Sequence, residues 1–113
     1  MAPVAGREAT VLTYIDPIES SPNNYRVLLE NEHVRVLRMT LKAGESDEQH
    51  SHPAMTVCFV KGGKIRIHLP DGQADEADFS DGDVLWHEAW THRIENIGDS
   101  PILSFIVEDK HAP

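Results

Sequence analysis

From Tyr25 onward, the hydrophobic residues come in short runs that are rich in β-branched and aromatic side chains, with turn signals roughly every ten residues. None of these runs keeps a helical apolar period over several turns. Short, regularly spaced strands are typical of a β-sandwich or β-barrel, so the pattern predicts an all-β fold. The expected strands are "YRVLLE", "HVRVLRMTL", "MTVCFV", "KIRIHL", "ADF", "DVLWH", "HRIENI" and "ILSFIVE".

The segments between these runs contain residues that favour turns. Gly62 and Gly63 separate two of the expected strands and suit a tight two-residue hairpin. Pro70, Asp71 and Gly72 form a second turn signal, because proline presets one backbone angle and glycine tolerates a positive one. The turns and the spacing of the runs together predict a barrel of roughly six to eight strands with almost no helix.

The first part of the chain differs from the rest. It contains Pro3, Pro17 and Pro22 and the loop-like stretch "DPIESSPNN". We therefore expect residues 1–24 to form an N-terminal arm or an irregular first strand, and residues 25–113 to form the barrel. With 113 residues in total, the chain has the length of one domain.

Two of the expected strands depart from simple alternation. In residues 33–41 the apolar positions change face between Val36 and Leu37, which indicates a bulge or a strand that serves two faces. In residues 102–108 both faces are apolar, as in a central strand or one covered by a second subunit. An uncovered apolar strand face favours aggregation, so we expect a homodimer, to which the N-terminal arm would also contribute.

Composition and charge narrow the classes of partner. The formal net charge of −9, with no cluster of basic residues, argues against a nucleic-acid partner. No apolar run is long enough to span a membrane, and the N-terminus lacks the basic start and apolar core of a signal peptide. The single cysteine, Cys58, excludes an internal disulfide framework and fits a reducing compartment. We therefore expect a soluble, cytoplasmic protein.

The seven histidines carry the candidate chemistry. His50 and His52 are two residues apart where a strand is expected to start, so their side chains point to one face. His92 shares its face with Ile94, which marks the core side, and a buried histidine needs a partner. These positions alone leave open whether the imidazoles are solvated, structural or converging on a metal ion. We expect His33, after an acidic turn, and His111, in the tail, to be exposed. His68 shares the outer face of its strand with Arg66, so we expect a solvent or subunit-contact role for it rather than a ligand role.

The spacing of these residues resembles that of the cupins, a superfamily of small conserved barrels. The first cupin motif is glycine, five residues, His-x-His, three or four residues, glutamate, six residues and glycine. Here Gly44, His50, His52 and Gly63 occupy those places, and Thr56 stands where the glutamate belongs.

The second cupin motif contains a glycine, Pro-x-Gly, a histidine and an asparagine. Gly82, His92 and Asn96 match it, whereas residues 88–90 read Glu-Ala-Trp instead of Pro-x-Gly and the connection is one residue shorter. The resemblance implies a jelly-roll β-barrel, or double-stranded β-helix, that covers roughly residues 26–108.

The resemblance also implies one divalent metal ion held by His50, His52 and His92. Without the glutamate, three neutral imidazoles leave the ion its full positive charge, which favours Lewis-acid or dioxygen chemistry on a small organic substrate. The ligand type admits iron, zinc, nickel or manganese. The sequence leaves open whether Glu48 or Glu88 completes the site.

Further residues are expected around this ion. His87 precedes the loop that carries Trp90 and is a candidate catalytic acid or base, although a surface position fits it as well. Thr56 would either bond a metal-bound water or simply pack at the strand start, and core packing is the alternative for the apolar candidates. The expected pocket residues are Met55, Thr56, Cys58, Trp86, Trp90, Ile94 and Phe105.

Two functions follow from these features. The favoured one is a metal-dependent enzyme with oxygenase, isomerase or lyase chemistry on a small-molecule substrate. The alternative is a non-catalytic cupin that binds a small ligand or a metal ion as a sensor or store. The fold does not decide between them, because one fold hosts many functions.

Overall fold

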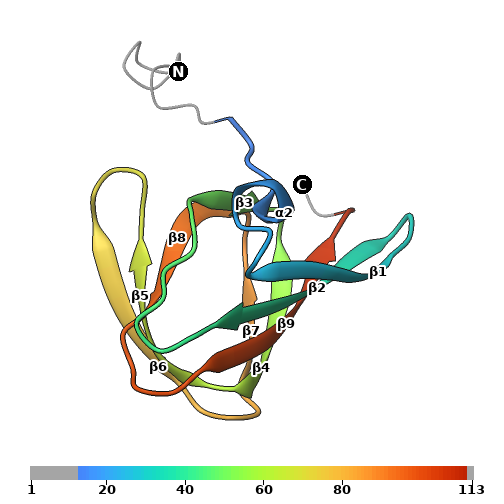
Figure 1. Cartoon of the computed structure of the whole chain (residues 1–113). Coiled ribbons are helices and arrows are strands. Elements are labelled where there is room, and N and C mark those ends of the chain that lie inside the picture. Colours follow the sequence, from blue (N-terminus) through green and yellow to red (C-terminus); the bar gives the residue numbers. More distant parts are fainter. Residues whose placement is uncertain (1–12, 112–113) are drawn as a thin grey trace.

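The computed structural model describes residues 13–111 of the chain, most of which lie in β-strands. The strands are β1 (Tyr25–Glu30), β2 (Val34–Leu41), β3 (His50–His52), β4 (Met55–Lys61), β5 (Gly63–His68), β6 (Ala74–Phe79), β7 (Val84–His87), β8 (Trp90–Asn96) and β9 (Ile102–Asp109). They form two sheets that enclose the core (Figure 1). One sheet has the strand order β1-β2-β9-β4-β7 and the other the order β3-β8-β5-β6. The predicted all-β jelly-roll fold is confirmed.

The described residues contain nine strands, more than the roughly six to eight expected from the spacing of the runs. One reason is that the two histidines near residue 50 form a strand of their own, β3, rather than the start of β4. Pro53 follows β3 and has no backbone N–H to donate, so the strand ends there, and β3 and β4 pair in different sheets.

β9 is the central strand of the five-stranded sheet, with antiparallel partners β2 and β4 on its two sides. Its alternate residues Ile102, Ser104, Ile106 and Glu108 are buried and point into the barrel. The intervening residues are only partly buried and face outward. The two apolar faces of this strand therefore have different surroundings, one in the core and one on the outer surface.

The predicted irregularity near Val36 and Leu37 is a β-bulge, and the extra residue lies on the neighbouring strand. The pairing of β1 with β2 shifts between Val27 and Leu29, which lie opposite Leu37 and Val36. β2 itself pairs with β9 in unbroken register. The sequence thus locates the irregularity near Val36 and Leu37, but only the pairing of the strands shows that the extra residue is on β1.

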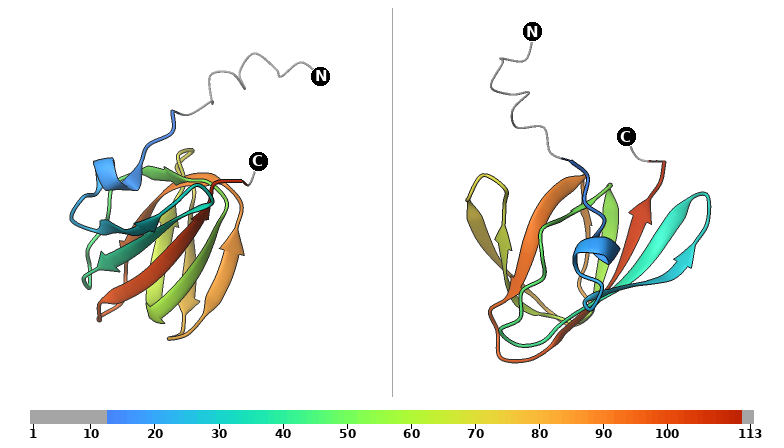
Figure 2. Two further views of the ribbon diagram at one scale, coloured as in Figure 1. Left: turned by 90° about the vertical axis from the view of Figure 1, so that its right-hand side faces the viewer. Right: turned by 45° about the horizontal axis from the view of Figure 1, so that its top comes forward.

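The described part of the N-terminal segment forms a short helix rather than an irregular strand. Helix α2 (Pro17–Ser20) begins after Asp16, whose side chain accepts a hydrogen bond from the Ile18 backbone N–H. It lies beside β1 and β3 (Figure 2). Ile15 exchanges two hydrogen bonds with Ser51, so this segment is tied to the strand that carries the paired histidines.

The domain boundary at residue 24 stays a prediction, and residues 1–12 of the proposed arm lie outside the described residues. No helix in the described part of the chain is long and apolar enough to cross a bilayer. The cytoplasmic location stays a prediction as well.

Candidate metal centre

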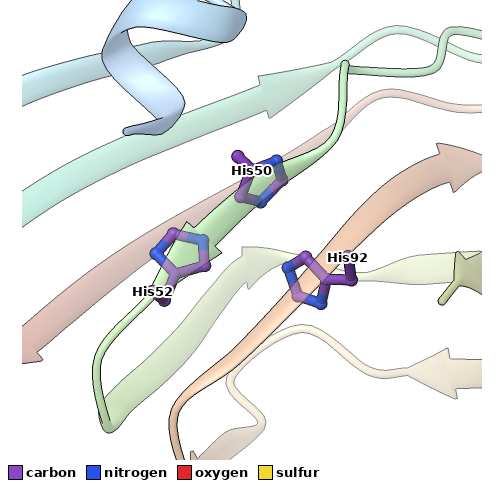
Figure 3. A group of neighbouring side chains, drawn as sticks. All are labelled: His50, His52 and His92. Atoms are coloured by element: carbon purple, nitrogen blue, oxygen red, sulfur yellow. The ribbon is translucent and has the colours of Figure 1, made fainter. Parts of the chain in front are cut away.

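Three histidines from two neighbouring strands meet inside the barrel (Figure 3). β3 pairs with β8 so that His50 lies opposite His92, and His52 follows on the same face. The ring centroids lie 4.7 Å apart for His50 and His92, 4.8 Å for His50 and His52, and 5.6 Å for His52 and His92. Ring nitrogens from all three lie within 4.8 Å of one another, and all three residues are buried. The structure therefore brings together the three imidazoles that the sequence singled out.

A buried carboxylate orients His52. Its Nδ1 lies 2.6 Å from Glu108 Oε2, so the ring donates its Nδ1–H there and keeps the Nε2 lone pair. Arg35 Nε donates to the other oxygen, Glu108 Oε1, at 2.8 Å, and the two terminal nitrogens of the same guanidinium donate to Asp16. Burial acts to raise the pKa of Glu108, but the hydrogen bonds from His52 and Arg35 outweigh burial and lower the pKa overall. The carboxylate is therefore ionised at neutral pH.

His50 is held by the backbone and by a buried polar pair. Its Nδ1 lies 2.8 Å from the Glu48 carbonyl oxygen, which can only accept, so the lone pair is on Nε2. The Tyr25 hydroxyl lies 3.1 Å from this Nε2 and 2.7 Å from Asp47 Oδ2. Burial raises the pKa of Asp47 to about 7, although hydrogen bonds from the Ile94 N–H and the Tyr25 hydroxyl act in the opposite direction. Because the Tyr25 hydroxyl donates its single proton to Asp47, it leaves the Nε2 lone pair of His50 available to a metal ion.

His92 differs from the other two histidines because its buried Nδ1 makes no hydrogen bond to the described part of the chain. Its ring packs edge-on against Trp90, with 4.2 Å between the ring centroids. Burial, aided by the neighbouring His50 and His52, lowers the pKa of His92 well below its usual value, and burial lowers the pKa of His50 to about 4. Both imidazoles are therefore neutral at pH 7, which is the form that binds metal ions.

This donor set fits a divalent metal ion. Three converging imidazoles form a ligand set that leaves coordination positions open. His50 and His52 each donate Nδ1–H to a fixed oxygen, the kind of contact that orients histidine ligands. The unpaired buried nitrogen of His92 is a further sign that the three rings are arranged for a group outside the protein chain.

An apolar cavity of about 140 Å³ lies next to the histidines, and His52 and His92 form part of its wall. Three of the residues expected in the pocket, Met55, Trp90 and Ile94, line this cavity. The other walls are also mostly apolar and include Val57, Phe59, Leu85 and Ile106.

Four residues expected in the pocket do not line the cavity, which corrects that part of the prediction. Successive strand residues point to opposite faces, so the buried Met55 and Val57 on β4 place Thr56 and Cys58 on the outer face. The same alternation turns Trp86 of β7 outward, where it is 51% exposed. Phe105 faces outward on β9 for the same reason. The position that matches the cupin glutamate, Thr56, therefore points away from the histidines.

His87 lies at the cavity wall rather than on the outer surface. Its ring stacks on that of Trp90, with 3.5 Å between the centroids. Its Nδ1 lies 2.7 Å from the Glu88 carbonyl oxygen, which leaves Nε2 with the lone pair. The side chain of Glu88 is on the outer face, where it accepts a hydrogen bond from Trp86, and Glu48 is exposed. The three-histidine group includes neither of these two carboxylates.

The remaining histidines lie away from the site. His68 is partly buried, and its Nε2 lies 2.9 Å from Glu95 Oε1. His33 and His111 are exposed, and their ring nitrogens approach each other to 2.8 Å. The expected exposure of His33 and His111 is confirmed.

The sequence analysis missed four polar residues around the histidines. Glu108 shares its face with Ile102 and Ile106, so strand alternation could have identified it as a buried carboxylate. The other three, which no local pattern marks, are Tyr25, Arg35 and Asp47.

The comparisons with known proteins agree with this architecture. The chain matches the sequence model of the cupin domain over residues 37–107, and no curated protein matches it. A cupin domain from Bordetella pertussis Tohama I is similar in structure, with a TM-score of 0.70 and 20% identity over 88% of this chain and 99% of that one. An uncharacterised conserved protein with a double-stranded β-helix domain from Klebsiella pneumoniae has a TM-score of 0.60 and 20% identity, over 100% and 94% of the chains.

A third similar structure is a predicted oxalate decarboxylase from Thermotoga maritima, with a TM-score of 0.53 and 23% identity over 75% of this chain and 77% of that one. These likenesses concern the fold. The sequence match, by contrast, covers most of the barrel and includes His50, His52 and His92. The chain therefore belongs to the cupin domain family.

Proposed function

We propose that this cupin binds one divalent metal ion through His50, His52 and His92 and uses it on a small organic molecule in the adjacent cavity. The observation that carries the proposal is the arrangement of the three rings. They are buried and converge, and two of them are oriented through Nδ1 by fixed oxygen atoms. A cluster of three buried imidazoles beside a cavity is costly to build without a ligand.

The ion would supply Lewis acidity or dioxygen chemistry, and the chain would supply binding and proton handling. Ligand type admits iron, zinc, nickel or manganese. His87 is the candidate for moving a proton, because its Nε2 lone pair is not used by the contact with the Glu88 carbonyl oxygen. Stacking on Trp90 at the cavity wall holds the ring in a fixed orientation.

The lining of the cavity favours an uncharged or weakly polar substrate. Apart from histidines, no ionisable residue other than Tyr25 lines the cavity within residues 13–111. A dicarboxylate such as oxalate, named in the description of the Thermotoga maritima protein, would have only a metal ion to balance its charge here. We therefore favour a different substrate class for this chain.

Metal analysis of protein purified without an affinity tag tests the proposal directly. The protein should contain close to one transition-metal ion per chain, and the metal-free form should regain it from solution. Turnover screens with each ion then separate an enzyme from the second candidate, a non-catalytic cupin. A His87→Asn variant that binds metal normally but loses turnover would support the enzyme, whereas ligand binding without turnover by any ion would support the alternative.

The metal-free protein should lose stability as the pH falls from about 6.5 to about 4. The unfolded imidazoles take up protons in this window, whereas the folded His50, with a pKa of about 4, and His92, with a lowered pKa, do not. Burial raises the pKa of Asp47 to about 7, so the folded state keeps a proton on Asp47 that the unfolded state lacks in this window. This proton offsets one of the two protons that the unfolded imidazoles take up. Above about pH 5, where Glu108 is ionised in both states, the unfolded state thus binds about one extra proton, which lowers the free energy of unfolding by about 1.4 kcal/mol for each pH unit by which the pH falls.

Denaturant unfolding of the metal-free protein at several pH values measures this effect. A His92→Asn variant removes one of the two titrating imidazoles and should flatten the dependence. A free energy of unfolding that stays constant from pH 6.5 to pH 4.5 would contradict the buried, neutral state of these rings.

We also propose that a second copy of the chain covers the outer face of the five-stranded sheet. Across this face, Cys58 lies between Val84 and Phe105, and Thr56 lies between Trp86 and Val107. Val84 is 64% exposed and Trp86 51%, so the apolar surface is accessible. Two copies that each carry a net charge of −9 repel each other, so the contact would form through the apolar middle of this face rather than at its edge, where Glu88 lies.

Light scattering at micromolar concentration should give the mass of a dimer. The Trp86→Lys variant places a charge within the contact and should give a monomer. Gln73→Lys, in an exposed turn of the other sheet, should remain dimeric. A monomeric mass for the unmodified protein would refute the proposed dimer.

A further inference from the structure

The cavity beside the histidines contains one buried hydroxyl that the proposed metal site does not use. Ser104 lies on the inward face of β9, is fully buried and lines the cavity. Its Oγ has no hydrogen-bond partner within residues 13–111. Because an unpaired buried hydroxyl destabilises a fold, its presence in a cavity wall points to a partner from outside the chain.

The surroundings of Ser104 are otherwise apolar. Its neighbours across the ladders are Met39 on β2 and Phe59 on β4. Phe59 stacks on Phe79, with 4.4 Å between the ring centroids, and both aromatic rings line the cavity. The serine hydroxyl is thus a single polar point in an apolar part of the wall.

Ser104 also lies away from the end of β9 that supports the histidines. Glu108, which binds His52, is four residues further along the same face, a separation of about 13 Å along an extended strand. Ile106 lies between them on that face. The inward face of β9 is therefore polar at Glu108 beside the histidines, apolar in the middle and polar again at Ser104, and of these residues Ser104 and Ile106 line the cavity.

The size and charge of the cavity limit what it can hold. Its volume of about 140 Å³ is close to that of an apolar protein cavity of about 150 Å³ that holds benzene. No lysine, arginine, aspartate or glutamate lines it within the described residues. A charged molecule would lose its hydration without a counter-charge from the chain.

We propose that the cavity binds a neutral organic molecule of about the size of a benzene ring, whose hydroxyl or carbonyl group hydrogen-bonds to Ser104 Oγ. The apolar walls enclose the body of the molecule. The opposite end of the molecule would face His50, His52 and His92, and this part of the proposal rests on the proposed metal function. The hydrogen bond to Ser104 does not require a metal ion.

Three probes of similar size test the proposal on the metal-free, full-length protein. Phenol carries the required hydroxyl, toluene replaces it by a methyl group, and benzoate carries a charge. Nuclear magnetic resonance titration should show that phenol binds in the cavity and that benzoate does not. If benzoate binds the metal-free protein as tightly as phenol, or if toluene binds more tightly than phenol, the proposal is overturned.

A serine variant gives the second test. Ser104→Ala should weaken phenol binding by about five- to a hundredfold, as expected for loss of a buried hydrogen bond, and leave toluene binding unchanged or stronger. Ser80→Ala, an exposed serine in a turn, is the matched control and should bind both as the parent does. Equal phenol affinity in Ser104→Ala and the parent would overturn the proposal. If Ser104→Ala fails to fold, the comparison of the three probes on the parent protein still tests the proposal.

Loading with zinc separates this inference from the proposed metal function. If zinc binds, phenol affinity should change on loading while the effect of Ser104→Ala persists. If zinc does not bind but phenol still depends on Ser104, the ligand pocket stands and the metal function fails. If zinc binds but phenol affinity is the same in the parent and in Ser104→Ala, the metal function is supported and the proposed ligand pocket is refuted.

Discussion

Alanine in place of His92 is expected to lower the affinity for a divalent metal ion by more than about a hundredfold. Loss of a contact that merely orients a ligand costs about ten- to a hundredfold, and loss of the ligand itself costs more. The same result is expected for His50→Ala and His52→Ala, because the three ring nitrogens lie within 4.8 Å of one another and act on one ion. Competition titrations with zinc, together with metal stoichiometry, measure the effect.

Two kinds of control accompany this set. His68→Ala and His111→Ala remove histidines that lie away from the site and should leave the affinity unchanged. Thr56→Glu adds a carboxylate at the position that matches the cupin glutamate, but its side chain faces outward and should not strengthen binding. If His92→Ala binds the ion as well as the parent does, the proposed site is wrong.

The second large effect concerns Glu108, which contacts no ion in our proposal. Glu108→Ala should lower metal affinity by about ten- to a hundredfold, because His52 loses the carboxylate that fixes its orientation. The variant should also lose about 3 kcal/mol of folding stability, since Glu108 is 3% exposed and Arg35 would lose a buried partner. The measurements are zinc competition and denaturant unfolding of the metal-free protein.

The structure offers a matched control for Glu108. Glu95 also contacts a histidine, His68, at 2.9 Å, but this pair is partly exposed on the outer face. Glu95→Ala should lower stability much less than Glu108→Ala does and should not affect metal binding. Glu108→Gln keeps the side-chain volume, so a loss of metal affinity in that variant would come from the lost charge and not from a cavity. Unchanged metal affinity in both Glu108 variants would show that His52 needs no support.

Local alternation explains how far the sequence could predict the pocket. Ile94 was predicted correctly because it belongs to an alternating run with a clear apolar face, and it lines the cavity. Thr56 matches the position of the cupin glutamate, which predicts inward side chains for Thr56 and Cys58, whereas the burial of Met55 and Val57 places both on the outer face. Both faces of β4 are largely apolar, so the sequence offered no sign of which face was inside.

The sequence by itself determined the strands, the common face of His50 and His52 and the inward position of His92, because these follow from backbone periodicity and turn residues within short segments. Only the tertiary structure decided that His50 lies opposite His92, that β3 is separate from β4, and that Glu108 supports His52. The last contact joins residues 56 positions apart. It depends on how β3 and β9 meet inside the barrel, which local propensity does not specify, because register is set by the burial of whole faces against each other.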